Sequence, residues 1–370
     1  MISEPLTEIK SADKVVWMTK PARSREVVSE IADYTILSLV TTIFKKLPKE
    51  KASEILMSAA ELLGSRVYDD FVTKKSITLR EWCENVNEFI FEPMGTEVKW
   101  LKIAEDLAEV EVLECPTSAR ALVVPEIICP FSYGFGRALL RKAFPKGEVK
   151  MLATLALGEK VCSFQFIKFS TKSTREEFKR MMEKAILPTA IELYPKPLTD
   201  FTVRIADYTI IALTDSIFSN LDKKEASELV ISSAEELGRL VFDKRVGKRI
   251  EKYTPMEWAK ITSTYIWNSQ GTGIVFSEIS NEKIVSHVFK CPTPERAGKA
   301  PHISCPFSWG YARGIWRSAF PDGEVLMGGT MAHGAPTCQF LWYVKTNKKL
   351  SEERERVKRY LTKEEEIRML

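Results

Sequence analysis

The chain has 370 residues, which is long for one domain and comfortable for two domains that each bury a core. Its 45% hydrophobic and 28% charged residues are typical of soluble globular proteins. The 54 basic residues nearly balance the 50 acidic ones, and no stripe of Lys and Arg stands out, so we expect no nucleic-acid partner.

The first 25 residues mix Glu, Lys, Asp and Arg without an apolar run, so nothing there is typical of a signal peptide. No stretch approaches the about 20 apolar residues that a membrane helix requires, and we expect no membrane partner. We therefore expect the protein in the cytoplasm. Thiols stay reduced there, so cysteine patterns indicate metal or catalytic sites before disulfides.

In chain order, the first predicted elements are helices. Apolar residues recur at helical spacing over 31–47 and 50–69, and residues 78–91 predict a third, shorter helix. Alternation in "TEVKWLKI" and "LAEVEVLE" predicts a β-hairpin. A helix with Pro130 in its first turn follows, and then two strands, "EVKMLATLAL" and "KVCSFQFIKF". The order ααα-ββ-α-ββ predicts an α+β domain with helices packed on an antiparallel sheet.

The same elements return in the second half of the chain. "IADYTILSLVTTIF" from Ile31 becomes "IADYTIIALTDSIF" from Ile205, and "CPFSYGFGRALLRKAFPKGE" from Cys129 becomes "CPFSWGYARGIWRSAFPDGE" from Cys305. The offset grows from 174 to 176, which indicates a small insertion near 245–253. Solenoid repeats span about 20–50 residues, so this longer period indicates two tandem copies of one domain. We expect an N-terminal lead (1–25), a first domain (26–182), a linker (183–200), a second domain (201–346) and a charged C-terminal helix (347–370).

Six of the seven cysteines form two triplets with the same spacings of 14 and 33 residues. The triplets are Cys115, Cys129 and Cys162, and Cys291, Cys305 and Cys338. All six remain in register although many other positions differ between the halves. This favours a chemical role for the cysteines over a role in packing alone. Three thiolates at one point suit a metal site, either zinc or an iron–sulfur cluster. The alternative is that the cysteines pack separately in the core, as we expect for Cys83, whose counterpart is Ala259.

Two cysteines are also candidate nucleophiles. Cys129 and Cys305 each precede a proline at the expected helix start, where an N-cap position would favour the thiolate. All three histidines, His287, His302 and His333, lie in the second half. His302 or His333 could therefore serve as a catalytic base beside Cys305, or both could be ordinary loop and strand residues.

The same helix carries further candidates. Arg137 and Arg313 lie about two turns into it and could bind the carboxylate of a ligand, or only cover the surface. Gly134 and Gly310 predict close packing of the helix. The charged run from Ser351 predicts a surface helix that could contact a protein partner.

The closing segments "TLALGEKVCSFQF" and "TMAHGAPTCQFLW", each preceded by the Cys-Pro helix, resemble the L-2-amino-thiazoline-4-carboxylic acid hydrolase-like family. They also resemble the broader 4-vinyl reductase domains, which end on a similar Gly-x-x-x-Cys-x-Phe strand. The resemblance implies an α+β small-molecule-binding domain in each half. The sensors of that group hold zinc with a Glu and a Cys, where this chain has Met151 and Thr154, or Met327 and Thr330. That zinc site is therefore not carried over.

The resemblance implies a hydrolase that opens a C–N bond of a small heterocycle through a cysteine-lined pocket. Two alternatives stay open. One is a metal or iron–sulfur protein with a three-cysteine site per repeat. The other is a non-catalytic module that binds a small molecule.

Overall fold

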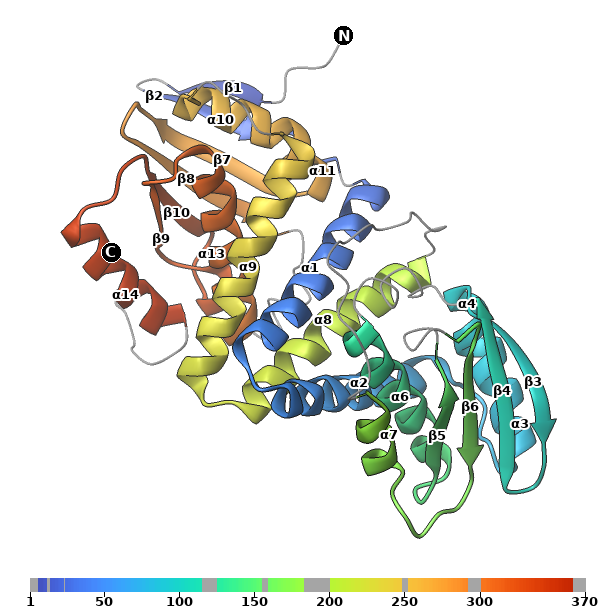
Figure 1. Cartoon of the computed structure of the whole chain (residues 1–370). Helices are drawn as coiled ribbons and strands as arrows, with labels where there is room; N and C mark the ends of the chain where they lie inside the picture. Colours follow the sequence, from blue (N-terminus) through green and yellow to red (C-terminus); the bar gives the residue numbers. More distant parts are fainter. Residues whose placement is uncertain are drawn as a thin grey trace. The chain divides into compact units, whose positions relative to one another are not determined.

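The computed structural model describes residues 6–11, 14–22, 24–114, 125–154, 159–182, 200–247, 252–291 and 301–361. The chain forms two compact units, Met1–Ile43 with Leu221–Leu370, and Phe44–Asn220. We name them by their sheets the six-stranded unit and the four-stranded unit (Figure 1).

The four-stranded unit has a sheet in the order β3-β4-β6-β5, in which all neighbouring strands are antiparallel. Its elements are α2 (Lys49–Phe71), α3 (Leu79–Val86), η1 (Asn87–Phe91), α4 (Glu92–Met94), β3 (Glu97–Ile103), β4 (Leu107–Glu114), α6 (Pro125–Ala143), β5 (Glu148–Ala153), β6 (Cys162–Ile167), α7 (Arg175–Met182) and α8 (Asp200–Asn220).

The six-stranded unit has a sheet in the order β1-β2-β7-β8-β10-β9, again antiparallel throughout. Its elements are β1 (Leu6–Ser11), β2 (Lys14–Thr19), α1 (Arg25–Lys46, whose last turn passes the unit boundary), α9 (Lys223–Arg245), α10 (Pro255–Thr262), η3 (Ser263–Trp267), α11 (Asn268–Gln270), β7 (Gly273–Ile279), β8 (Lys283–Lys290), α13 (Pro301–Ala319), β9 (Glu324–Met327), η4 (Met331–His333), β10 (Cys338–Tyr343) and α14 (Lys348–Leu361).

The predicted class, α+β with antiparallel sheets, is confirmed, and the predicted helices and hairpins are present. Local sequence signals explain several boundaries. Thr78 and Thr254 open α3 and α10 with a capping box, in which a glutamate three residues on completes the hydrogen bonds. Gly95 and Gly271 follow α4 and α11 with φ of 70° and 81°, a left-handed conformation that suits glycine.

The N-terminal lead forms a β-hairpin, an element that the sequence patterns do not predict. Strand β2 pairs with β7 through Trp17 opposite Phe276 and Met18 opposite Val275. The Thr19 hydroxyl accepts a hydrogen bond from the backbone N–H of Ile274 at 2.8 Å. The hairpin thus pairs with backbone groups on the edge of β7 that would otherwise lack partners in the sheet.

The two compact units differ from the consecutive domains that we expected, because the first helix of each half belongs to the other unit. Helix α1 contacts α9, where Ser38 Oγ donates to the carbonyl of Ser233 at 2.5 Å. Helix α8 contacts α2, where Ser216 Oγ donates to the carbonyl of Ile55 at 2.6 Å. Both helices carry the "IADYT" sequence. Each helix therefore has the apolar residues needed to pack at the position of the other. The expected linker lies outside the described residues up to Asp200.

One face of each sheet packs against helices to form the core (Figure 1). In the six-stranded unit the Trp258 ring lies edge-on to Trp316 with centroids 4.7 Å apart. Helices α9 and α13 approach so closely that a Cβ on Gly310 would lie 2.5 Å from a backbone oxygen of α9. A Cβ on Gly134 would lie 2.9 Å from a backbone oxygen of α2. The predicted close packing at both glycines is confirmed.

Helix α1 corrects the expectation that no stretch has the length and apolar character of a membrane span. Its 22 residues meet both criteria by length and composition only. Of its apolar window, 61% is buried inside the protein, and the core helices of globular proteins have the same properties. Its Thr35, for example, is buried and donates to the carbonyl of Ile31.

Candidate cysteine site

The second cysteine triplet gathers at one end of the six-stranded sheet. Cys338 is the first residue of β10 and lies opposite Val288, while Cys291 directly follows β8. Side chains alternate along a strand, so Cys338 shares the helix-facing side with the buried rings of Phe340 and Trp342. Cys305, in the second turn of α13, belongs to the same core and is only 5% exposed.

The thiols of this triplet are close enough to affect one another. The pKa of Cys305 is raised to about 12, mainly by burial; the Thr330 hydroxyl opposes this rise, and the neighbouring Cys338 and Cys291 add to it. Burial also raises the pKa of Cys338, and Cys291 again contributes. Burial raises the pKa of Cys83 to about 12 as well, but the charges that act on it come from Arg80 and Glu84. Mutual influence between thiols therefore distinguishes the triplet from an ordinary buried cysteine.

The predicted N-cap position of the candidate nucleophiles is wrong. Helices α6 and α13 begin at Pro125 and Pro301, one turn earlier than expected, and Pro130 and Pro306 lie inside them. Cys305 is therefore the fifth helical residue, and burial keeps it a thiol. Cys129 has the same place in α6, but its side chain lies outside the described part of the chain.

A line of hydrogen bonds connects Cys305 to a histidine. Its Sγ lies 3.7 Å from Thr330 Oγ1, and that hydroxyl lies 2.6 Å from His333 Nδ1. Thr330 is fully buried. The backbone N–H of Met331 donates to Cys338 Sγ at 3.3 Å, so the neighbouring residues Thr330 and Met331 contact two of the three thiols. The structure thus brings together Cys305, Cys338 and His333 from the predicted set.

The first triplet can be followed only in part. Cys162 Sγ donates to Thr154 Oγ1 at 3.6 Å, and Thr154 is fully buried. Cys115 and the side chain of Cys129 lie outside the described residues, so convergence in this half stays a prediction. The side chain of His302, in the first turn of α13, is also outside them.

The described side chains bear on metal binding at the cysteines. Among them, no group of three or more His, Cys, Asp or Glu residues is arranged to hold a metal ion. The second triplet, all of whose members are described, is therefore not among such groups. For the first triplet the expected zinc or iron–sulfur site stays a prediction.

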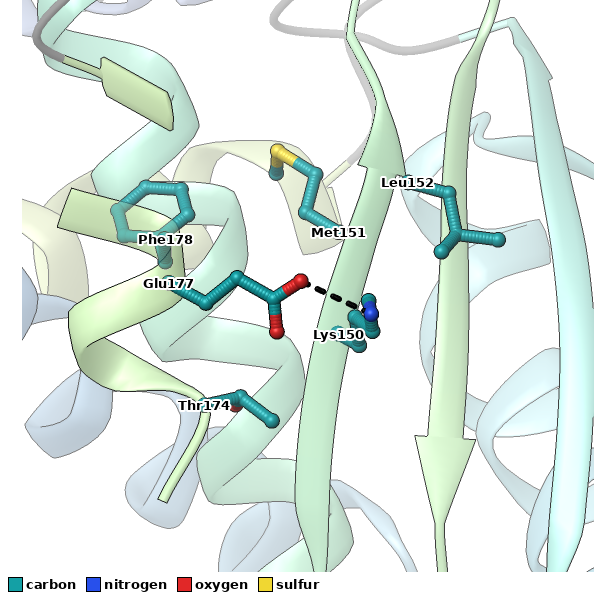
Figure 2. Close-up of a pocket in the computed structure, with 6 residues that line it drawn as sticks. All are labelled: Lys150, Met151, Leu152, Thr174, Glu177 and Phe178. Carbon is teal, nitrogen blue, oxygen red and sulfur yellow. Dashed lines mark ion pairs between the residues drawn. The ribbon is translucent and has the colours of Figure 1, made fainter. Parts of the chain in front are cut away.

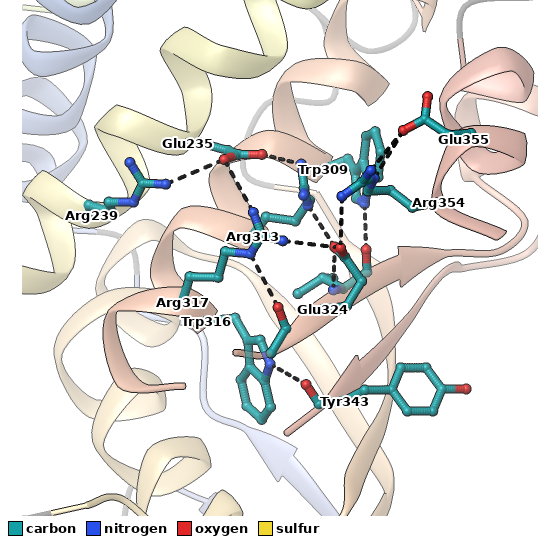
Figure 3. Close-up of polar contacts among 12 residues, drawn as sticks. Glu235, Arg239, Trp309, Arg313, Trp316, Arg317, Glu324, Tyr343, Arg354 and Glu355 are labelled. Atoms are coloured by element: carbon teal, nitrogen blue, oxygen red, sulfur yellow. Dashed lines mark hydrogen bonds and ion pairs between the residues drawn. The ribbon is translucent and has the colours of Figure 1, made fainter. Parts of the chain in front are cut away.

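The predicted ligand-binding arginines instead pair with buried carboxylates. Arg313 donates through Nε to Glu324 at 2.8 Å and through Nη1 to Glu235 of α9. Arg317 and Arg354 also reach Glu324, at 3.1 and 3.5 Å (Figure 3). Protein carboxylates therefore occupy the Arg313 guanidinium, and α14 docks into its own unit through Arg354.

The four-stranded unit repeats this network. Arg137 donates to Glu148 through Nε and Nη2 at 2.9 and 3.0 Å, and through Nη1 to Glu61 of α2 at 2.5 Å. Burial would raise the pKa of the Glu148 carboxyl, but the hydrogen bonds and charge of Arg137 and the charge of Arg141 hold it below its ordinary value. In both units the network ties the helices to the first residue of a strand, so it positions these elements.

A pocket of about 230 Å³ lies elsewhere, between β5 and α7 of the four-stranded unit (Figure 2). Its wall combines the apolar Met151, Leu152 and Phe178 with Thr174, and an ion pair of 2.8 Å joins Lys150 to Glu177 across it. Among the side chains that the structure describes, none of the predicted catalytic or metal residues lines it. We place the candidate site at the cysteines, where reactive groups meet.

Sequence reasoning missed Thr330, Glu61 and Glu235. A signal was present for each, since Thr154 matches Thr330 at the start of the closing segments and the two glutamates match in "AELLG" and "AEELG". Comparison with known proteins adds no family, because no family model matches the chain and no curated protein matches it.

Proposed function

We propose that the protein is a thiol-dependent hydrolase of a small molecule, with Cys305 as its nucleophile. The observation that carries this proposal is the connection of the buried Cys305 through Thr330 to His333, at 3.7 and 2.6 Å. A thiol beside a positioned base is the arrangement that nucleophilic catalysis requires. Because Cys305 is almost fully buried, the substrate must be small.

The reaction that we infer is hydrolysis of a C–N bond in a small heterocycle. The Sγ–carbon bond forms as the carbon–nitrogen bond breaks, and the proton that leaves the thiol ends on the departing nitrogen. Water then hydrolyses the acylated cysteine and restores the thiol. The resemblance to the hydrolase-like family supports this choice of bond, and Cys291 and Cys338 would form part of the pocket wall.

We further infer that the two halves are copies of one small-molecule-binding domain that resembles the 4-vinyl reductase type. Three repeated features support this. The strand order β3-β4-β6-β5 matches β7-β8-β10-β9. Both third helices start with a capping box, and both units bury an Arg–Glu pair at matching positions, Arg137 with Glu148 and Arg313 with Glu324.

The test compares turnover of cyclic C–N substrates, including 2-amino-thiazoline-4-carboxylate, by the wild-type protein and three variants. Cys305→Ala should lower the rate at least about 10³-fold, because it removes the nucleophile. Cys83→Ala is the matched control, since it removes another buried cysteine, on which the charges of Arg80 and Glu84 act and no other thiol among the described residues, and it should leave the rate unchanged. Cys129→Ala should affect stability or metal content more than turnover.

Full turnover by Cys305→Ala would exclude this function. Metal and acid-labile sulfide analysis of anaerobically purified protein separates the alternatives. Stoichiometric metal that is lost in the triplet variants would favour the metal or iron–sulfur prediction. Binding of the substrate analogues without turnover or metal would favour the non-catalytic module.

A further inference from the structure

We propose that His333 is the base that takes the proton of Cys305 and that the hydroxyl of Thr330 relays it. The inference rests on the proposed role of Cys305 as the nucleophile. It also assigns the reaction to the six-stranded unit alone.

The hydrogen-bond directions follow from the chemistry of the three groups. The Cys305 thiol donates to Thr330 Oγ1 at 3.7 Å. The single hydroxyl hydrogen of Thr330 then points to His333 Nδ1 at 2.6 Å, which assigns the histidine hydrogen to Nε2. When the Cys305 thiol is deprotonated, one proton moves from Sγ to Thr330 Oγ1 and another from Oγ1 to His333 Nδ1. Thr330 is unchanged, and the products are a thiolate and an imidazolium.

The backbone holds this line of groups in place. The carbonyl of Thr330 accepts hydrogen bonds from the N–H groups of His333 and Ala335, both at 3.0 Å. Gly334 closes the turn with φ of 90°, a conformation that suits glycine and that other residues adopt only with strain. Thr330 is fully buried and Cys305 is 5% exposed, so bulk water has little access to the thiol proton. A protein group must therefore take that proton.

The four-stranded unit provides an internal comparison. It also has a thiol–threonine contact, since Cys162 donates to the buried Thr154 at 3.6 Å. Cys162 corresponds to Cys338, however, and the side chain of Cys129, which corresponds to Cys305, lies outside the described residues. In the sequence, however, the position that corresponds to His333 is Leu157, and all three histidines of the chain lie in the second half. Both units thus place a thiol against the matching threonine, through cysteines that do not correspond. The histidine adds the base, and only the six-stranded unit has it.

The test measures the rate at which iodoacetamide alkylates Cys305 in the full-length protein at neutral pH, by mass spectrometry of the Cys305 peptide. Thr330→Val keeps the shape of threonine but has no hydroxyl, and His333→Asn keeps a hydrogen-bond acceptor that is no base. Each should slow alkylation at least about 10²-fold, the usual contribution of general-base catalysis. Thr330→Ser retains the hydroxyl and should stay within a few-fold of the wild type.

Thr154→Val is the control in the other unit and should leave the Cys305 rate unchanged. Thermal melting of every variant checks the fold, and the contrast between Thr330→Ser and Thr330→Val separates relay from packing. Wild-type rates in Thr330→Val and His333→Asn, or no alkylation of Cys305 in the wild type, would overturn the inference. Alkylation that depends on Thr330 and His333 without turnover of any substrate would keep the relay and reject the hydrolase.

Discussion

Replacing Arg313 by methionine should destabilise the six-stranded unit strongly. The Arg313 side chain is 7% exposed and pairs with Glu324, which is fully buried, and with Glu235, which is 15% exposed. Methionine keeps most of the volume and the helix propensity of arginine, so the change mainly removes the charge and its hydrogen bonds.

The magnitude follows from what Glu324 retains. Removing one partner of a buried ion pair costs about 3–5 kcal/mol, because a buried charge is left behind. Here Glu324 keeps Arg317 at 3.1 Å and Arg354 at 3.5 Å, so we expect the lower end, about 3 kcal/mol. With a urea dependence of about 3 kcal/mol per molar, the unfolding midpoint should fall by about 1 M.

Tryptophan fluorescence in urea is a suitable assay, because six of the eight tryptophans lie in the six-stranded unit. These are Trp17, Trp258, Trp267, Trp309, Trp316 and Trp342. Arg239→Met is the matched control on α9. Its side chain is 53% exposed and lies 3.5 Å from Glu235, so its loss should cost at most about 1 kcal/mol. Equal losses in the two variants would refute the reasoning.

Further expectations concern the four-stranded unit and the exchange of helices. Gly134→Ala should lower the free energy of unfolding by about 1–3 kcal/mol, because its Cβ would lie 2.9 Å from a backbone oxygen of α2. Gly136→Ala in the same helix meets nothing closer than 3.4 Å and should be neutral or stabilising, and similar melting temperatures for the two would contradict this. The pKa of the Glu148 carboxyl is lower in the folded protein than its ordinary value of 4.5, so this group stabilises the fold at pH values above 4.5. That stability is lost as the pH falls through the folded-state pKa. Glu148→Gln should flatten this acid dependence of the melting temperature, and an unchanged profile would exclude Glu148 as its source. Fragments 1–199 and 200–370 should form a one-to-one complex in size-exclusion chromatography, since each supplies a helix to the other's unit; two stable separate monomers would show that the exchange is dispensable.

Much of the fold could be predicted from local sequence. The helices at 31–47 and 50–69 and the hairpin of "TEVKWLKI" and "LAEVEVLE" were predictable because apolar spacing reports which side chains are buried. The duplication allows the two halves of the chain to be compared, and the six cysteines stand at matching positions in both halves. The matched Gly134 and Gly310 predicted close helix packing for the same reason.

Other features depended on partners distant in the chain. Pro125 and Pro130 are both acceptable near a helix start, so local preference does not choose between them, and the structure starts the helix at the earlier one. The sequence predicts a charged helix position for Arg137 but not whether a ligand or a buried carboxylate meets it. That depends on α2, which supplies Glu61.

The exchange of α1 and α8 was likewise beyond the sequence. The two helices carry nearly the same apolar residues, so either could satisfy either unit, and chain connectivity and packing decide between them. The candidate site follows the same rule. The sequence by itself determined that Cys305 and His333 belong to one half of a duplicated chain. Only the tertiary structure placed the buried hydroxyl of Thr330 between them, because a hydrogen bond depends on distance and direction in space and not on separation along the chain.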